Sequence, residues 1–171
     1  AVALLKETEF YPHNLGEGKL SNAEENEVDY YKGIAYQKLG NDAESTKYLM
    51  KATQGSTEPQ QAFYYNDQQP DKIFYQGLAW RALGEENKAR SRFNKLIDHG
   101  KKHLFDDCKI DYFAVSLPEL AIWEDNLNIR NQIHCYYVMA LGYSGLGKEE
   151  LAEEYYEKVK RLDVNKQVFR M

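Results

Sequence analysis

The chain has 171 residues, of which 43% are hydrophobic and 13% aromatic, and it carries 14 tyrosines but only 4 prolines. This composition is typical of a folded globular chain and argues against intrinsic disorder. The formal net charge is −5 at pH 7 and the sequence has no basic stripe, which disfavours a nucleic-acid partner. Since no apolar run reaches about 18 residues, the sequence predicts no membrane-spanning helix.

The first eight residues, AVALLKET, have the pattern of the last turns of a helix that ends before Pro12. We expect this helix to be the second helix of a preceding helix pair, so that the chain is a fragment of a longer protein. An incomplete pair exposes an apolar face, which could join two copies of the chain through the N-terminal helix. Residues 13–22 are rich in Gly and Asn and predict a loop.

The stretch 29–52, DYYKGIAYQKLGNDAESTKYLMKA, predicts two helices separated by a turn at Gly40. The first helix is expected to run from about residue 24 to 39, and Asn41 with Asp42 can cap the second. An insertion at about 55–70 follows, with prolines at both ends. Within it, Phe63 to Tyr65 are expected to lie on a short helix.

A second helix pair is expected at about 71–102, with its turn at Gly84 and with Pro70 in the first turn of its first helix. A third is expected at about 131–162, with its turn at Gly147. The insertion between them, about 103–130, is apolar from Tyr112 to Trp123. We expect that stretch to pack against the helices, because it is too apolar for an exposed loop.

The three pairs share a column pattern when they are aligned on the turn glycines. Seven residues before each glycine is a small residue: Gly33, Gly77 and Ala140. Nine residues after it is a large apolar residue: Leu49, Phe93 and Tyr156. The small residue allows the two helices to approach, and the large one fills the space beside it.

This helix-turn-helix pattern resembles the tetratricopeptide repeat, although the turn glycines are 44 and 63 residues apart (84 − 40 and 147 − 84) rather than about 34. The prediction is therefore an all-α, tetratricopeptide-like right-handed α-solenoid of three helix pairs, with a preceding half-repeat and helical insertions. Residues 1–171 are expected to form a single domain, with repeats at about 24–54, 71–102 and 131–162.

Longer strings resemble one group of large bacterial tetratricopeptide proteins. They are YPHNLGEGK at 11–19, YYNDQQPDKIFYQGLA at 64–79, KHLFDDCKIDYFAVSLPEL at 102–120 and RNQIHCYYVMALGYSGLG at 130–147. Those proteins carry an N-terminal β-rich domain of uncharacterised function, the DUF5107 type, before a long repeat array. The resemblance implies that this chain matches the C-terminal end of the array and that a β-rich domain precedes it. It implies no catalytic residues.

Two pairs of residues that contain histidine are candidate chemical sites. His99 and His103 are four residues apart near Cys108, but Gly100 lies between them and the glutamate of an HExxH motif is absent. A structural role at a helix C-terminus is favoured. His134 and Cys135 are adjacent, and neighbours on a helix point about 100° apart, so a nucleophile pair is disfavoured.

Paired polar residues at Asn66-Asp67 and Asp106-Asp107 could act as acid and base, but turn and capping roles explain them. The glycines are isolated, so no phosphate-binding loop is present. The sequence therefore predicts no catalytic residue, no metal site and no cofactor, and it indicates that the chain is not an enzyme.

In tetratricopeptide arrays the first helices of the repeats line a concave groove. The corresponding positions here are aromatic and aliphatic: Tyr30, Ile34, Phe74, Leu78, Tyr137 and Leu141. The Lys and Asn residues by which chaperone-binding members hold a carboxylate are absent from these positions. Since large exposed apolar patches are rare, the groove is either filled by residues 63–65 and 112–123 or covered by a partner.

The sequence thus predicts a non-catalytic protein–protein interaction or scaffolding module. Its partner would be another protein or the upstream domain of the same chain. The alternative is an accessory domain of a carbohydrate-processing enzyme whose catalytic or sugar-binding part lies in the absent β-rich domain. Cys108 and Cys135 do not indicate a disulfide framework and leave the compartment open.

Overall fold

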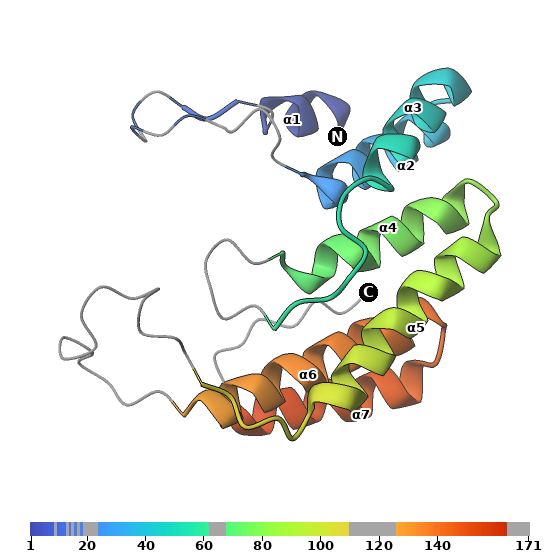
Figure 1. The fold of residues 1–171 in the computed structure, drawn as a ribbon. Coiled ribbons are helices and arrows are strands. Elements are labelled where there is room, and N and C mark those ends of the chain that lie inside the picture. Colours follow the sequence, from blue (N-terminus) through green and yellow to red (C-terminus); the bar gives the residue numbers. More distant parts are fainter. Residues whose placement is uncertain are drawn as a thin grey trace. The chain divides into compact units, whose positions relative to one another are not determined.

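The computed structural model describes residues 1–8, 10–12, 14, 16, 18, 24–61, 68–109 and 126–163. These residues form seven α-helices and no strand (Figure 1). The helices are α1 (Val2–Glu7), α2 (Asn26–Lys38), α3 (Asp42–Ala52), α4 (Pro70–Ala82), α5 (Glu86–His103), α6 (Leu127–Gly145) and α7 (Glu149–Leu162). The predicted all-α class is confirmed for this part of the chain. The expected helix at 63–65 and the apolar stretch 112–123 lie outside the described residues.

The chain divides into two compact units. The first unit comprises Ala1–Glu58 and Asp71–Phe93, and the second comprises Pro59–Pro70 and Asn94–Met171. Helix α5 therefore contributes its first residues to the first unit and its last residues to the second. Each unit has its own set of buried side chains and is described by itself below.

The predicted glycine turns are confirmed at all three positions. Gly40, Gly84 and Gly147 have φ angles of 72°, 82° and 70°, in the left-handed region that glycine adopts at least cost. At each turn the amide that follows the glycine donates to a carbonyl five residues earlier, for example Asn41 N to Tyr36 O at 3.0 Å. This pattern is the Schellman motif, which satisfies the last carbonyls of a helix.

The predicted columns of small and large residues meet in the first unit. A Cβ atom added to Gly33 would lie 2.6 Å from Leu49 Cγ, and one added to Gly77 would lie 2.4 Å from Phe93 Cε1. No side chain fits at such distances, so glycine at these positions sets how closely α2 approaches α3 and how closely α4 approaches α5. The sequence pattern therefore predicted actual contacts.

The core of the first unit lies between α2, α3 and α4. Leu49, Ala52 and Ala79 are fully buried there, and four partly buried side chains pack against them: Tyr30, Ile34, Ala82 and Leu83. The start of α5 joins this unit through Phe93, whose ring centroid lies 5.8 Å from that of Phe74. Helix α1 packs against α2, and none of its residues is buried.

The second unit is organised around α6, which buries ten of its residues. Asn126 caps α6 by accepting hydrogen bonds from the amides of Asn128 and Ile129. Helix α7 packs against α6 and buries one face, made of Ala152, Tyr156 and Val159. The spacing of four and three residues is that of an amphipathic helix.

Candidate functional site

An open apolar groove lies between α1 and α2 in the first unit, with a volume of about 870 Å³. Its lining residues are Ala1, Val2, Leu4, Leu5, Tyr31, Ile34, Ala35, Lys38 and Leu39. Leu4 and Leu39 remain 68% and 70% exposed, and Tyr31 remains 45% exposed. Large apolar side chains gathered on one surface in this way mark an interaction site more often than isolated exposed ones do.

Three tyrosines form the part of the first unit next to this groove. The ring centroids of Tyr30, Tyr31 and Tyr75 lie 5.4 to 5.7 Å apart, in tilted and edge-on arrangements that aromatic pairs favour. The hydroxyls of Tyr31 and Tyr75 are 3.2 Å apart and hydrogen-bonded. Burial raises the pKa of Tyr75, and the bond to Tyr31 adds to this effect. The exposed Tyr31 ring is therefore held in place by its contacts with Tyr75, which is buried and neutral.

The predicted groove residues have different environments. Tyr30, Ile34 and Leu78 are partly buried in the first unit, where Phe74 is buried against Phe93. Tyr137 and Leu141 are buried in the second unit, and the Tyr137 ring lies 6.4 Å from that of Tyr156. Only Ile34 also lines the α1–α2 groove. The wider groove through all six positions stays a prediction.

Sequence reasoning missed the α1–α2 groove, apart from its expectation of an exposed N-terminal helix. Leu4, Tyr31 and Leu39 lie outside the columns of small and large residues that the three pairs share. Their position outside these columns could have indicated the groove, because an apolar residue that does not belong to the repeat core needs another explanation.

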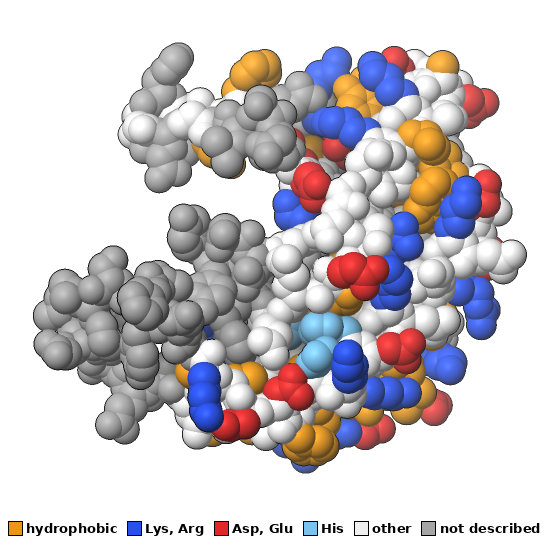
Figure 2. Space-filling view, in the orientation of Figure 1, with side chains coloured by type: hydrophobic (Ala, Val, Ile, Leu, Met, Phe, Trp, Pro, Cys, Tyr) orange, Lys and Arg blue, Asp and Glu red, His pale blue; other side chains and the backbone are white. Residues whose placement is uncertain are grey.

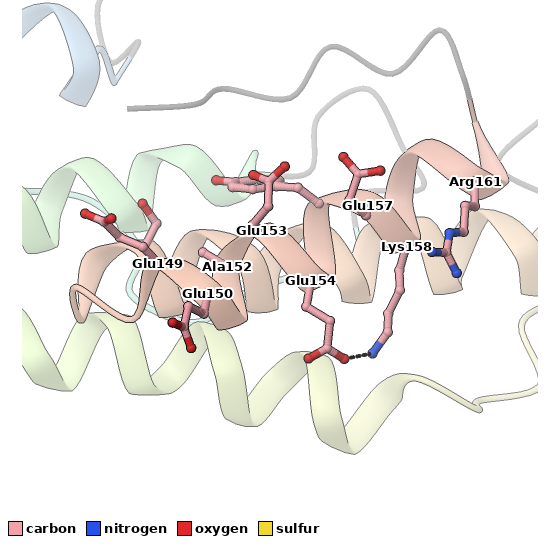
Figure 3. Close-up of a pocket in the computed structure, with 10 residues that line it drawn as sticks. Glu149, Glu150, Ala152, Glu153, Glu154, Glu157, Lys158 and Arg161 are labelled. Atoms are coloured by element: carbon pink, nitrogen blue, oxygen red, sulfur yellow. Dashed lines mark hydrogen bonds and ion pairs between the residues drawn. The ribbon is translucent and has the colours of Figure 1, made fainter.

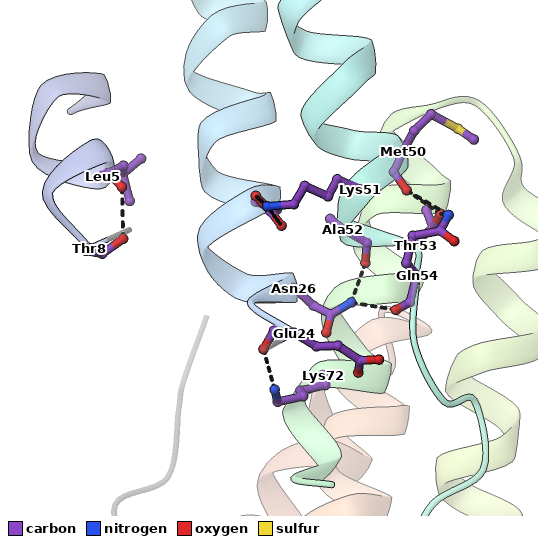
Figure 4. A network of polar contacts seen from close by, with 11 residues as sticks. Leu5, Thr8, Glu24, Asn26, Met50, Lys51, Ala52, Thr53, Gln54 and Lys72 are labelled. Carbon is purple, nitrogen blue, oxygen red and sulfur yellow. Dashed lines mark hydrogen bonds and ion pairs between the residues drawn. The ribbon is translucent and has the colours of Figure 1, made fainter. Parts of the chain in front are cut away.

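A polar network closes the C-terminal end of α3 (Figure 4). Asn26 Nδ2 donates to the carbonyls of Ala52 and Gln54 at 2.8 and 2.9 Å. Gln76 Nε2, from α4, donates to the carbonyls of Gln54 and Ser56 at 2.8 and 3.0 Å. These amides satisfy carbonyls that a helix end leaves unpaired, so the network has a structural role.

Three contacts made by charged side chains flank the same network. Lys72 donates to the Glu24 carbonyl (Figure 4), and Arg92 Nε donates to Gln76 Oε1 at 3.2 Å. The buried Asp29 pairs with Lys51 at 3.1 Å, and burial raises the pKa of Asp29 against the opposing effect of Lys51. These groups support the start of α2 and the segment after α3.

An open pocket of about 840 Å³ follows the exposed side of α7 in the second unit (Figure 3). Five glutamates line it, at positions 149, 150, 153, 154 and 157, together with Lys158 and Arg161. Glu154 pairs with Lys158 at 2.7 Å, one helical turn away. This arrangement is typical of the solvated face of an amphipathic helix.

Three histidines from α5 and α6 form a cluster in the second unit, and the histidine side chains make one patch in Figure 2. The ring centroid of His99 lies 4.6 Å from that of His103 and 6.0 Å from that of His134. His103 Nδ1 lies 2.6 Å from Asp106 Oδ2, and His134 Nε2 lies 2.7 Å from the Gln60 carbonyl. This cluster (His99, His103 and His134) is called the histidine cluster below.

The cluster differs from the candidate metal site at His99, His103 and Cys108. Within residues 1–8, 24–61, 68–109 and 126–163 and the few others described, no group of three or more His, Cys, Asp or Glu side chains is arranged to hold a metal ion. His103 and His134 instead have protein partners at Asp106 and Gln60. In the candidate acid–base pair Asp106-Asp107, Asp106 pairs with His103 and Asp107 pairs with Lys109. The other candidate pair, Asn66-Asp67, lies outside the described residues.

Cys135 follows His134 in the sequence, and its side chain is buried. Its hydrogen-bond partner is Asn131, not His134. Its Sγ donates to Asn131 Oδ1 at 3.7 Å. Burial raises the pKa of Cys135 to about 12, so the thiol is protonated near neutral pH. A reactive cysteine requires the opposite shift, toward the thiolate.

Two stretches of the chain match models of the tetratricopeptide repeat, residues 73–99 and residues 133–165. The first lies on α4 and α5, and the second on α6 and α7. No solved structure matches the chain. Together with the helical architecture, these matches define a tetratricopeptide-like α-solenoid fold.

Tetratricopeptide repeats generally mediate protein–protein interaction or scaffolding, and domains built from them are typically non-catalytic. The fold class therefore indicates protein partners for this chain. None of the described helices has both the length and the apolar character needed to cross a bilayer.

Proposed function

We propose that the chain is a protein-interaction module that binds an apolar segment of a partner protein in the α1–α2 groove. The observation that carries the proposal is the exposure of Leu4, Leu39 and Tyr31 around one open groove, in a fold class that generally binds proteins. Covering these side chains would remove apolar surface from water, which contributes about 25 cal/mol per Å².

The groove has the chemistry of a helix-binding surface. Its floor is aliphatic, Tyr31 adds an aromatic ring with a hydroxyl, and Lys38 is its charged lining residue. An amphipathic partner helix would place apolar residues at helical spacing over Leu4 and Leu39. A carboxylate at the edge of that helix would pair with Lys38.

The six-residue groove predicted from the sequence is a further candidate surface. The partial exposure of Tyr30, Ile34 and Leu78 supports it in the first unit. Ile34 belongs to both surfaces, so the α1–α2 groove would extend the predicted one. Replacing Leu4 affects the α1–α2 groove alone, which distinguishes the two.

Site-specific photo-crosslinking in the cells that make the protein tests the proposal. A photoreactive residue at position 39 should give a defined adduct, and Leu4→Glu in the same chain should abolish it. Gln37 is exposed on the same helix but does not line the groove, so it is the matched control position. Equal adducts from both positions, or none from position 39, would contradict the proposal.

The adduct also identifies the occupant. Mass spectrometry distinguishes a second copy of this 19.9 kDa chain, a segment upstream of it in the same protein, and an unrelated protein.

The alternative role as an accessory domain of a carbohydrate-processing enzyme rests on the sequence resemblance. A sugar-binding surface would combine exposed aromatic rings with paired carboxylates. The carboxylates along α7 lie beside Tyr156, but the ring of Tyr156 is buried.

A further inference from the structure

The histidine cluster lies where three segments of the second unit meet. His99 and His103 are on the last turns of α5, His134 is on α6, and Gln60 belongs to the segment 59–61. The bond from His134 Nε2 to the Gln60 carbonyl joins residues that are 74 positions apart in sequence. Asn131 Nδ2 donates to the His103 carbonyl at 2.6 Å, which ties α6 to the end of α5.

The hydrogen bonds fix where two of the imidazole protons lie. A carbonyl oxygen only accepts, so His134 Nε2 carries a hydrogen and donates to Gln60. His103 Nδ1 faces a carboxylate oxygen and donates to Asp106. Both histidines can gain a second proton without losing these bonds.

His99 is in a different position, since its ring is close to both of the other rings. Its Nε2 is buried and has no hydrogen-bond partner in the part of the chain that the structure describes. A proton added to His99 would place a cation 4.6 Å and 6.0 Å, centroid to centroid, from two further imidazoles. The His99 side chain is partly exposed, but its Nε2 lies out of reach of water, so a charge there would lack both water and a partner. The packed arrangement therefore favours neutral His99.

The charged groups around His99 do not offset this cost. Lys102 and His103 on α5 oppose a positive charge there, and the carboxylate of Asp106, which favours such a charge, already binds His103. From α6, His134 faces the ring and Cys135 is a neutral thiol. Segment 59–61 contributes Gln60, which carries no charge.

We propose that the histidine cluster is an acid-sensitive link that holds the end of α5, the start of α6 and segment 59–61 together while His99 is neutral. Acidification protonates His99 more readily in the open form than in the closed one, so it shifts the population toward the open form. The opening would release Gln60 from His134 and the His103 carbonyl from Asn131.

The pH window follows from the shift of His99. Burial, with His103 adding to it, lowers the pKa of His99 from 6.5 to about 4. A histidine whose folded-state pKa is lowered contributes stability that is fully present above the unfolded-state value and is lost as the pH falls. The link should therefore weaken progressively between about pH 6.5 and pH 4.

Amide hydrogen exchange of the whole chain at pH 7.5 and pH 5.0 tests the proposal, with rates converted to protection factors. Linkage for this shift predicts that protection at residues 98–106 and 128–135 falls on the order of tenfold at pH 5.0. Residues 26–52 of α2 and α3 serve as the internal reference and should not lose protection at pH 5.0. His99→Phe retains a ring but cannot titrate, so it should remove the pH dependence.

His13→Phe removes a histidine elsewhere in the sequence and should leave the effect unchanged. If the pH dependence persists in His99→Phe, or if residues 98–106 keep their protection at pH 5.0, the proposal is wrong. Proton NMR titration of the wild-type imidazoles provides a second test, which does not depend on the folding of His99→Phe. A His99 that titrates near pH 6.5 without loss of protection would overturn the proposal on its own.

Discussion

The C-terminal ends of α3 and α5 are closed by the same kind of contact but with different chemistry beside it. In the first unit, Asn26 and Gln76 donate to the carbonyls that follow α3. In the second unit, Asn131 donates to the His103 carbonyl at the end of α5. Neutral amides perform the capping in both places, yet only the α5 end adds titratable imidazoles. The comparison indicates that the amide hydrogen bonds at both helix ends are insensitive to pH, whereas the histidine contacts beside the α5 end are sensitive to it.

The largest expected effect comes from breaking the α5 junction by steric clash. A Cβ at Gly100 would lie 2.6 Å from the Cys135 carbonyl oxygen and 2.6 Å from Met139 Cγ. Since the first neighbour is backbone and cannot move away cheaply, Gly100→Val should lower the free energy of unfolding by about 3 kcal/mol. Urea unfolding followed by circular dichroism measures this change.

Gly18→Val is the matched control, because a Cβ at Gly18 meets nothing within 4 Å. It should change stability by less than about 0.5 kcal/mol. Gly100 would not be a packing position if the two variants unfolded at the same urea concentration. In hydrogen exchange, Gly100→Val should lower protection in α6 more than in α2 and α3.

Removing one amide cap in each unit compares the two helix ends directly. Gln76→Leu leaves the Gln54 and Ser56 carbonyls without this donor, and Asn131→Leu does the same to the His103 carbonyl. Each substitution should cost about 1 kcal/mol, the net contribution of a typical hydrogen bond, because these bonds are only partly buried and the Gln54 carbonyl keeps its bond from Asn26.

The pH dependence of these two costs sharpens the comparison. At pH 5.0 the cost of Gln76→Leu should equal its value at pH 7.5, whereas that of Asn131→Leu should shrink because the cluster is already partly open. Chemical denaturation of both variants at the two pH values measures this. Equal costs of Asn131→Leu at both pH values would show that its hydrogen bond and the histidine cluster act independently.

The sequence allowed prediction of the features that depend on local chemistry. Gly40, Gly84 and Gly147 adopt the expected turn conformation, and Gly33 meets Leu49 as the column pattern indicated. Asn41 caps α3 through the amide of Glu44, as expected. Such features follow from residue type and short spacing, because backbone conformation and neighbouring helix contacts determine them.

The histidine cluster could not be predicted in the same way. The sequence grouped His99 with His103 and His134 with Cys135, because those residues are close along the chain. The contact between His99 and His134 depends on how α5 packs against α6, and the bond to Gln60 depends on a segment 74 residues away. The α1–α2 groove was missed for a related reason, since exposure depends on what packs nearby rather than on residue type.

The smallest expected effect concerns Asp29, which tests whether the two units respond to acid with opposite signs. Burial raises the pKa of Asp29 above 3.8. A carboxyl group whose folded-state pKa is raised contributes stability that is fully present below the unfolded-state value and is lost as the pH rises through the folded-state value. Acid should thus strengthen the Asp29 contribution in the first unit, whereas it weakens that of His99 in the second.

Asp29→Asn isolates this contribution, because asparagine resembles the protonated carboxyl group. The variant loses the ion pair with Lys51, whose side chain is 61% exposed, and it also avoids burying a charge. These effects oppose each other, so stability at pH 7.5 should change by less than about 1 kcal/mol. The variant should gain less than the wild type on acidification toward pH 4, as measured by urea unfolding at both pH values. A loss of several kcal/mol at pH 7.5 would mean that the pair with Lys51 outweighs the cost of burial, and the raised pKa would then be wrong in sign.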